Sequence, residues 1–271
     1  IIDLEHARVM GIINTTPDSF YSGSRLQEEK AVIEQAKNFL EEGATFIDIG
    51  GHSTRPGADI IPEEEELNRT IPFIRLILQE FPDALISIDT FRSSVAQQAL
   101  DAGAVIVNDV SGGNLDEEMF ATVAENQVPY ILMHMRGDPK TMQDKADYKD
   151  VTQEIITELS GKVEKLHAMH VPDVIIDPGF GFAKTVDQNF QLLRQLEAFR
   201  VFDLPILAGL SRKSMIKKVL GNQPEKALNG TTVLNTLALM NGANILRVHD
   251  VKEAMETVGL LDKYRQAGSW Q

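Results

Sequence analysis

The sequence contains no cysteine, one tryptophan and far fewer basic than acidic side chains. Without cysteine there are no disulfides, thiol nucleophiles or thiolate metal sites, and a cytoplasmic location is favoured. No run of about 18 apolar residues occurs, so no membrane span is predicted. Charged residues interrupt the amino-terminal segment, so no signal peptide is expected. A formal net charge of −14 argues against non-specific nucleic-acid binding, which needs a basic face.

What the sequence does contain is a series of apolar, strand-like runs that each end in a polar or glycine-rich motif. The eight runs cover residues 9–14, 45–51, 85–90, 104–109, 130–136, 173–179, 205–213 and 245–250. Helical segments follow them, and 271 residues is a typical length for one closed barrel of such units. We therefore predict an α/β protein with one (β/α)8 barrel domain over residues 1–271. A doubly wound open sheet is the structural alternative, because a βαβ pattern does not prove closure.

Three connections after predicted strands are longer than the turns require and are rich in Gly, Pro, Ser, Thr or Asp. They cover residues 14–27, 50–62 and 135–149, after the first, second and fifth strands. In a barrel such loops carry binding and catalysis. Elsewhere, Pro72 is expected to kink or split the second helical stretch. Residues 221–227 are expected to divide the seventh helical region into two pieces.

Acids and an amide end three of the predicted strands: Asp89, Asn108 and Asp177. Each follows an apolar run, so each should lie at the barrel mouth, partly shielded from water. A buried carboxylate is costly unless it is paired or hydrogen-bonded. Any one of these side chains can be satisfied by neighbouring backbone, but three together favour a ligand that offers several N–H donors. The edge of a 2-amino-4-oxo pyrimidine is such a ligand.

Cationic side chains follow the seventh and eighth strands, where barrels often bind phosphate. Ser211 and Lys213 follow the seventh, and Arg247 and His249 alternate along the eighth and so share one side. Arg55 lies in the loop at residues 50–62. Cations gathered at strand ends in an acidic chain indicate a specific anionic ligand. Arg212 is interpreted as a surface residue at the start of a helix.

A metal site is suggested only weakly, by the first loop. Asn14 at the end of the first strand and Asp18 in the loop after it offer oxygen ligands suited to Mg²⁺ beside a pyrophosphate. Asn and Asp are equally common as turn residues. The six histidines show no zinc-binding spacing. His134 is predicted to be structural, and His167 and His170 to face solvent.

Taken together, these motifs resemble those of the dihydropteroate synthase family over nearly the whole chain. In order they are GIINTTPDSF, DIGGHSTRPGA, SIDTFR, VNDVSGG, MHMRG, IIDPGFGF, GLSRKS and RVHDV. The resemblance implies a transferase that joins 6-hydroxymethyl-7,8-dihydropterin pyrophosphate to p-aminobenzoate, giving 7,8-dihydropteroate and pyrophosphate in folate biosynthesis. It also implies a homodimer, a requirement for Mg²⁺ and inhibition by sulfonamides.

The resemblance also implies a role for each matching residue. The pterin would be held by Asp89, Asn108, Asp177 and Lys213. The pyrophosphate would contact Asn14, Thr54, Arg55, Arg247 and His249. The p-aminobenzoate pocket would use Thr54, Arg55, Pro56, Phe182, Ser211 and Lys213. The catalytic groups would be Asp89, Asp177, Lys213, Arg247 and His249, with Asn14 and Asp18 as the metal ligands.

One position departs from the family pattern. Ser22 stands in the first loop where many members carry a second Asp, so Asp18 would have to act there without it. Two other functions fit part of the sequence. A pterin-binding methyltransferase domain would share the barrel and the pterin acids but would not need the cationic cluster. A non-catalytic pterin-binding protein would bind the pterin and release no product.

Overall fold

Eight parallel strands form the centre of the computed structural model, which describes residues 2–15, 25–52, 61–138, 141–221 and 227–267. The strands are β1 Arg8–Asn14, β2 Phe46–Gly50, β3 Ile86–Asp89, β4 Ile106–Asp109, β5 Tyr130–Met133, β6 Val174–Asp177, β7 Leu207–Ala208 and β8 Ile245–Val248. Strands β1 to β6 pair in chain order, β1 also pairs with β8, and β8 pairs with β7. A bridge between Ile176 and Ile206 joins β6 to the segment entering β7. The predicted (β/α)8 barrel is confirmed, and the open sheet is excluded.

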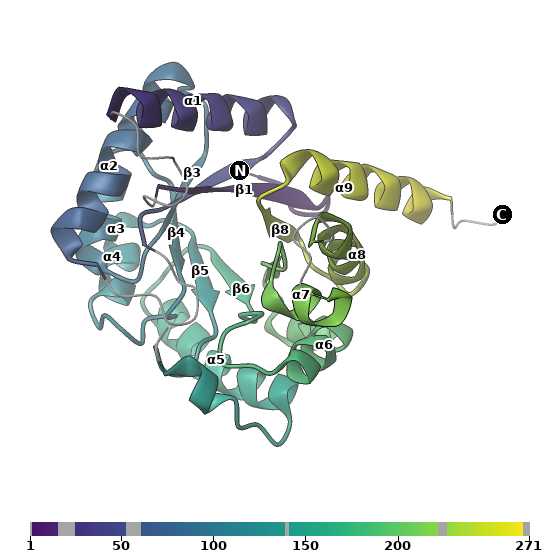
Figure 1. Ribbon diagram of the computed structural model, residues 1–271. Coiled ribbons are helices and arrows are strands. Elements are labelled where there is room, and N and C mark those ends of the chain that lie inside the picture. The colour runs from purple at the N-terminus through teal and green to yellow at the C-terminus, as the bar shows by residue number, and fades with distance from the viewer. Residues whose placement is uncertain (1, 16–24, 53–60, 139–140, 222–226, 268–271) are drawn as a thin grey trace.

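Helices surround the strands on the outside of the barrel (Figure 1). They are α1 Arg25–Glu41, α2 Glu63–Glu80, α3 Ser93–Asp101, α4 Met119–Asn126, α5 Val151–Ala168, α6 Val186–Arg194, α7 Ser214–Leu220, α8 Ala227–Met240 and α9 Val251–Gln266. Short 3₁₀ helices cover Met142–Lys145 and Leu196–Phe202. The predicted division of the seventh helical region is confirmed, because α7 ends at Leu220, before the cap residue Gly221, and α8 begins at Ala227. No helix in the described ranges is long and apolar enough to cross a membrane.

Two details of the sequence prediction are wrong. The seventh strand is much shorter than residues 205–213, because only Leu207 and Ala208 keep strand pairing. Leu210 to Lys213 instead form a turn, in which the N–H of Lys213 donates to the carbonyl of Leu210. Pro72 does not split the second helix, since α2 is continuous from Glu63 to Glu80.

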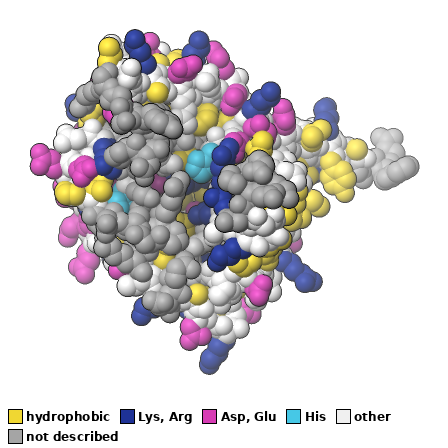
Figure 2. Space-filling model, in the orientation of Figure 1, with side chains coloured by type: hydrophobic (Ala, Val, Ile, Leu, Met, Phe, Trp, Pro, Cys, Tyr) yellow, Lys and Arg dark blue, Asp and Glu magenta, His cyan; other side chains and the backbone are white. Residues whose placement is uncertain are grey.

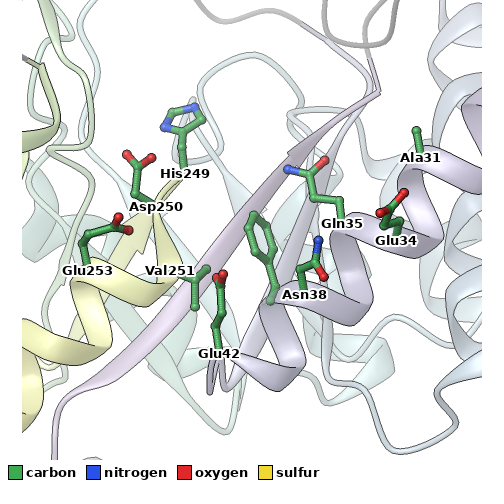
Figure 3. A pocket seen from close by; sticks show the side chains of 10 residues that line it. Ala31, Glu34, Gln35, Asn38, Glu42, His249, Asp250, Val251 and Glu253 are labelled. Atoms are coloured by element: carbon green, nitrogen blue, oxygen red, sulfur yellow. The ribbon is translucent and has the colours of Figure 1, made fainter. Parts of the chain in front are cut away.

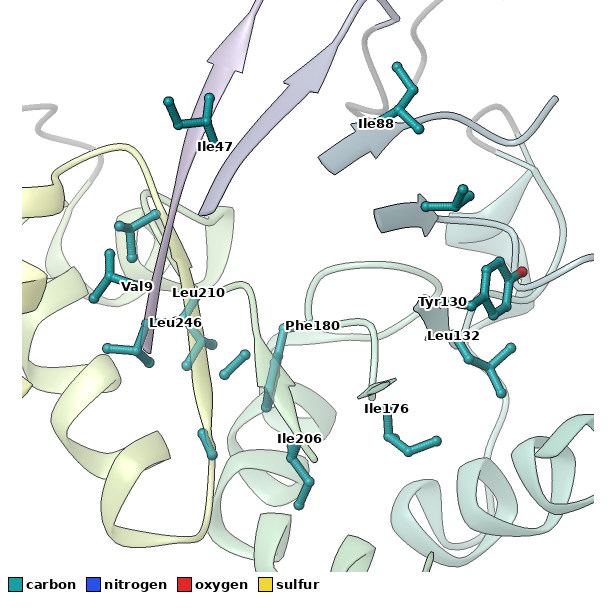
Figure 4. Close-up of a cluster of buried hydrophobic side chains, with 14 of the residues drawn as sticks. Val9, Ile47, Ile88, Tyr130, Leu132, Ile176, Phe180, Ile206, Leu210 and Leu246 are labelled. Atoms are coloured by element: carbon teal, nitrogen blue, oxygen red, sulfur yellow. The ribbon is translucent and has the colours of Figure 1, made fainter. Parts of the chain in front are cut away.

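Two apolar layers result from the alternation of side chains along the strands. The outward-facing layer, between strands and helices, is the main core, and Figure 4 shows members such as Ile47, Ile88 and Leu246. The inward-facing layer fills the barrel interior and is contributed by most of the strands: Met10, Phe46, Ile106, Ile131, Ile175, Leu207 and Ile245.

The next inward position along several strands is polar. Two residues after Phe46, Ile106, Ile175 and Ile245 come Asp48, Asn108, Asp177 and Arg247. Because strand side chains repeat every second residue, these polar groups lie directly above the apolar layer, on the side of the carboxyl strand ends. The fold thus places a polar layer at the barrel mouth, where the active sites of such barrels lie.

Candidate active site

Asp48 and Arg247 lie at the centre of the polar layer. The Nε of Arg247 donates to Oδ2 of Asp48 at 2.6 Å, and its Nη2 donates to Oδ2 of Asp89, also at 2.6 Å. The amide nitrogen of Asn108 donates to the same Oδ2 of Asp48 at 3.0 Å. All three partners of this network are buried. The contact with Asp48 uses Nε, and the contact with Asp89 uses Nη2. Nη1 is therefore the guanidinium nitrogen that no described side chain accepts a hydrogen bond from.

Asp177, at the end of β6, is fixed by the backbone that follows it. Its Oδ1 accepts the N–H of Gly179 at 2.8 Å. Gly179 has a φ of +73°, and a Cβ at that position would lie 2.0 Å from the carbonyl oxygen of His134. Only glycine allows this turn. Asp177 is 6% exposed, and its Oδ2 makes no hydrogen bond with the described residues and so remains available to a ligand.

Lys213 and Phe182 form the neighbouring part of the mouth. The Nζ of Lys213 lies 4.3 Å from the centroid of the Phe182 ring, at cation–π distance. Phe182 is buried in a small apolar cluster at the mouth that includes Phe91, Val110 and Met135. This arrangement offers a flat aromatic surface beside a cation, as a small aromatic acid requires.

Ser211 and His249 meet between the ends of β7 and β8. The Ser211 Oγ lies 3.0 Å from Nδ1 of His249 and accepts the backbone N–H of His249 at 3.2 Å. Arg212 is exposed and bonds to Asp250 through Nε and Nη2, at 3.0 and 2.5 Å. The predicted surface role of Arg212 is thereby confirmed, and the two flanking residues face inward.

Burial shifts the pKa values of the ionisable groups at the mouth, and nearby opposite charges partly oppose these shifts. Burial raises the pKa of Asp89 to about 7, although Arg247 opposes the shift. Burial also raises the pKa of Asp177, against the Gly179 N–H and Lys213. It lowers the pKa of Lys213 to about 8 and, together with Arg247, that of His249 to about 4. Perturbed pKa values in one cleft are typical of a functional site.

The predicted residues of the first and second loops are only partly placed. Asn14 is half-buried at the end of β1, in register with Gly50 of β2. Asp18, Ser22, Thr54, Arg55 and Pro56 lie outside the described residues. Within the described ranges, no three His, Asp or Glu side chains converge to hold a metal ion. That is compatible with Mg²⁺, which is usually held by one or two protein oxygens together with waters and substrate phosphates.

A pocket of about 380 Å³ lies beside the mouth, outside the barrel (Figure 3). It is lined by α1 and by the segment from His249 into α9. Its charged side chains are all acidic: Glu34, Glu42, Asp250 and Glu253. Such a lining repels a pyrophosphate. By contrast, Figure 2 shows Lys and Arg side chains beside a histidine near the centre of the face, with most acids at its margin.

Sequence reasoning gave no role to two residues that the structure makes prominent. The sequence predicts Asp48 at the mouth, among the polar residues at the strand ends, and in the structure it joins Arg247 to Asn108. Lys184 is 4% exposed and makes three polar contacts beneath the mouth. Nothing in its sequence context indicates burial. His134 is buried and bonded to Glu158, as expected of a structural histidine, and His167 and His170 are exposed.

The barrel and its mouth define an enzyme-like site for a ligand that presents N–H donors to buried acids and an anion to cations. Comparison with known proteins identifies the class. Residues 10–249 match the family described as pterin binding enzyme.

Relatives narrow the identification. The chain is 48% identical over 253 residues to a dihydropteroate synthase of Synechocystis, covering 92% of this chain and 87% of that protein. The Xanthomonas albilineans dihydropteroate synthase solved with 4-aminobenzoic acid superposes with a TM-score of 0.90 at 37% identity, covering 97% of this chain and 95% of that one. The Yersinia pestis enzyme, solved with a sulfonamide drug complex, gives 0.89 at 39%, covering 98% and 96%. The chain belongs to the pterin-binding enzyme family and, within it, groups with the dihydropteroate synthases, transferases of folate synthesis.

Proposed function

We propose that the described mouth catalyses the condensation of 6-hydroxymethyl-7,8-dihydropterin pyrophosphate with p-aminobenzoate. One observation carries the assignment of residues: two buried acids, Asp89 and Asp177, lie close enough to Lys213 and Arg247 to interact electrostatically with both. The acids suit the N–H edge of the pterin, and the cations suit its oxygen and the pyrophosphate.

The pterin lies, in this proposal, across the polar layer. Asp177 accepts from the pterin N–H groups through Oδ2, because Oδ1 is held by Gly179. Asn108 supplies a further amide contact, and Lys213 donates to a ring carbonyl or nitrogen. Asp89 lies in the same layer, with its charge partly balanced by Arg247. Burial strengthens each of these interactions relative to water.

The second substrate lies toward Phe182. The Phe182 ring packs against the ring of p-aminobenzoate, and Ser211 and Lys213 face the carboxylate of that substrate. We expect Thr54, Arg55 and Pro56 to complete this pocket from the second loop. The pocket would thus be shaped by one loop on each side of the substrate.

The reaction begins with cleavage of the bond between the pterin methylene carbon and the pyrophosphate oxygen. Arg55, Arg247 and His249 stabilise the departing pyrophosphate, and the anionic carboxylates of Asp89 and Asp177 stabilise positive charge on the pterin. The amine of p-aminobenzoate then attacks the methylene, and its extra proton passes to solvent. That amine is unprotonated near neutral pH, so no strong base is required.

We also propose that the reaction uses Mg²⁺. Asn14 at the end of β1 and Asp18 in the first loop would supply protein oxygens, and the ion would neutralise charge on the pyrophosphate. Ser22 removes one carboxylate that many relatives carry there. Activity should therefore disappear with EDTA and return with added Mg²⁺.

The test is to follow dihydropteroate by chromatography and pyrophosphate release together, with and without p-aminobenzoate. Equal amounts of the two products support the synthase. Pterin binding without product would point instead to a methyl-carrier or non-catalytic pterin protein. A sulfonamide should compete with p-aminobenzoate, as expected if both occupy the Phe182 pocket. We propose the cytoplasm as the location, which the lack of cysteine favours.

We further propose a homodimer formed through α7, α8 and α9. Exposed apolar side chains gather on these helices, and Figure 2 shows hydrophobic side chains along the side where α8 and α9 lie. They are Val219, Leu220, Val233, Leu237, Met240, Leu260 and Tyr264. A contiguous exposed apolar surface of this kind is typical of a subunit interface.

Two substitutions test the dimer by sedimentation. Leu237→Glu, at the centre of the α8 surface, should yield monomers. Val105→Glu, at an exposed apolar side chain before β4 on the opposite side of the barrel, is the control and should leave the dimer intact. A monomeric wild-type protein, or equal effects of the two changes, would contradict this interface.

A further inference from the structure

Lys184 is a buried cation directly beneath the mouth, in the loop between β6 and α6. It is 4% exposed. Its Nζ donates to the carbonyl of Gly179 at 2.9 Å and to the carbonyl of Phe182 at 2.9 Å. The third contact is Nδ1 of His134, at 3.2 Å. An ammonium group has three N–H donors and no acceptor, so these three partners satisfy it completely.

The contact with His134 fixes the tautomer of that ring. Burial lowers the pKa of Lys184 to about 7, so the ammonium form predominates below that pH. In that form Lys184 can only donate, so Nδ1 of His134 is the unprotonated nitrogen and Nε2 carries the hydrogen. Nε2 lies 3.0 Å from Oε2 of Glu158 on α5, a carboxylate that accepts it. Burial lowers the pKa of His134 to about 4, which keeps the ring neutral. Glu158 is held in turn by Arg136.

The two carbonyls that Lys184 engages belong to the residues that shape the site. Gly179 donates its N–H to Oδ1 of Asp177 at 2.8 Å. Phe182 presents its ring to Nζ of Lys213. One buried ammonium therefore holds the peptide that orients the pterin acid and the peptide that carries the aromatic wall.

A stabilising role alone does not explain this lysine. Burying an ammonium is costly, and apolar residues of similar size often replace buried charges without loss of stability. A glycine-containing loop with left-handed residues at Gly179 and Gly181 has little intrinsic preference for one shape. The three hydrogen bonds of Lys184 hold this loop in one conformation.

We infer that Lys184 is a positioning residue, which acts through the Gly179 and Phe182 carbonyls to set both Asp177 and Phe182, with His134 as its third acceptor. The inference rests on the proposed function, since it concerns the two substrates assigned to this mouth. Lys184 itself touches neither Asp177 nor Lys213 in the hydrogen bonds of the structure.

The first test replaces Lys184 by methionine and measures Michaelis constants for both substrates. In K184M we expect both constants to rise about ten- to hundredfold, because small misplacement of binding groups has effects of that size. K162M is the matched control. Lys162 caps the loop after β4 in the same way, donating to the carbonyl of Gly112 at 2.7 Å and to Asn114 at 2.9 Å, and its loss should change either constant less than about threefold.

The second test separates positioning from stability at His134. In H134N the amide oxygen occupies the place of Nδ1 and still accepts from Lys184, while the bond to Glu158 is lost. In H134Q the amide nitrogen occupies the place of Nε2 and keeps Glu158, while the acceptor for Lys184 is lost. We expect near wild-type constants in H134N and raised constants in H134Q, whatever the order of their melting temperatures.

If H134N and H134Q have equal Michaelis constants, or if those of H134N are the higher, the inference is overturned. This holds even if K184M fails to fold. Wild-type protein that forms product, combined with unchanged constants in K184M and H134Q, overturns the role of Lys184 alone. Wild-type protein that forms no product overturns the proposed function. In that case the role of Lys184 is tested by calorimetry with the pterin pyrophosphate. We still expect K184M and H134Q to bind this compound more weakly than H134N does.

Discussion

Arg247 and Asp48 form a buried ion pair that joins β8 to β2 past the intervening β1, with 2.6 Å between Nε and Oδ2. Asp48 is fully buried, and the same oxygen also accepts from Asn108. The pair therefore fixes the orientation of a guanidinium that the proposed reaction needs.

Removal of Asp48 should both destabilise the barrel and misdirect Arg247. In D48A the guanidinium loses one of its two buried anions, and breaking such a pair costs about 3–5 kcal/mol of unfolding free energy. D48N should lose less, because its amide oxygen still accepts from Nε. Urea unfolding measures both. A D48A protein as stable as wild type would show that Arg247 finds another partner, contrary to the arrangement described.

Asp177→Asn is the sharpest test of the pterin site. The amide oxygen can keep the Gly179 N–H bond, so the fold should be retained, but the second oxygen becomes an N–H₂ that faces the pterin donors. Hydrogen bonds to charged groups contribute about 1.5–3 kcal/mol, so pterin binding should weaken about ten- to hundredfold or more. Calorimetry measures the binding, and turnover should fall with it. A near-normal enzyme would refute the assigned role of Asp177.

The barrel was predictable because each strand is marked in the sequence by an apolar run and by a polar residue or motif at its end. Phe46 and Asp48, or Ile175 and Asp177, stand two residues apart, so one rule of alternation places a core residue and a mouth residue together. Asn108, Asp177 and Arg247 stand at such positions, whereas Lys213 was predicted from its place after the seventh apolar run. The length of β7 was not, since an apolar run that ends in a turn reads like a strand.

Contacts made by long side chains could not be predicted from the sequence. Arg247 was assigned to an anion from its position, but nothing in its position shows that Asp48 and Asp89 bind it first. Burial of Lys184 could not be predicted either, because lysine is rarely buried and its third contact, His134, lies after β5, 50 residues away. Such pairings arise only when the barrel closes.

The pH dependence of the reaction should be bell-shaped. Burial raises the pKa of Asp89 to about 7, so the anion that stabilises the pterin cation is populated only above that pH. Burial lowers the pKa of Lys213 to about 8, so its ammonium is lost above that pH. The value of kcat/KM, which reports the free enzyme, should rise through about pH 7 and fall through about pH 8.

K213R separates the two limbs, because an arginine keeps its proton throughout this range. Its residual activity should retain the acid limb and lose the alkaline one. The acid limb belongs to Asp89. An alkaline limb unchanged in K213R would mean that some group other than Lys213 produces it.

The last prediction concerns Glu66 and Arg92, a second buried ion pair, which lies beside the end of the second loop. Glu66 is fully buried on α2, accepts from the Thr90 hydroxyl at 2.6 Å and pairs with Nη1 of Arg92. The Nη2 of Arg92 donates to the carbonyl of Ile61 at 2.6 Å, where the second loop enters α2. The pair thus holds the end of a loop that should carry Thr54 and Arg55.

Glu66→Ala should lower the unfolding free energy by about 3–5 kcal/mol, because it leaves Arg92 without its anion in a largely buried place. Glu65→Ala is the control one residue away. Glu65 also pairs with an arginine, Arg69, but the Glu65 side chain is 44% exposed, and exposed pairs contribute about 0–1 kcal/mol. Urea unfolding of both variants measures the difference. E66A should also raise the Michaelis constant for p-aminobenzoate, whereas E65A should not. Equal stability losses would mean that the Glu66 site is open to water, and loss of stability without a change in that constant would mean that the end of the second loop is held by other contacts.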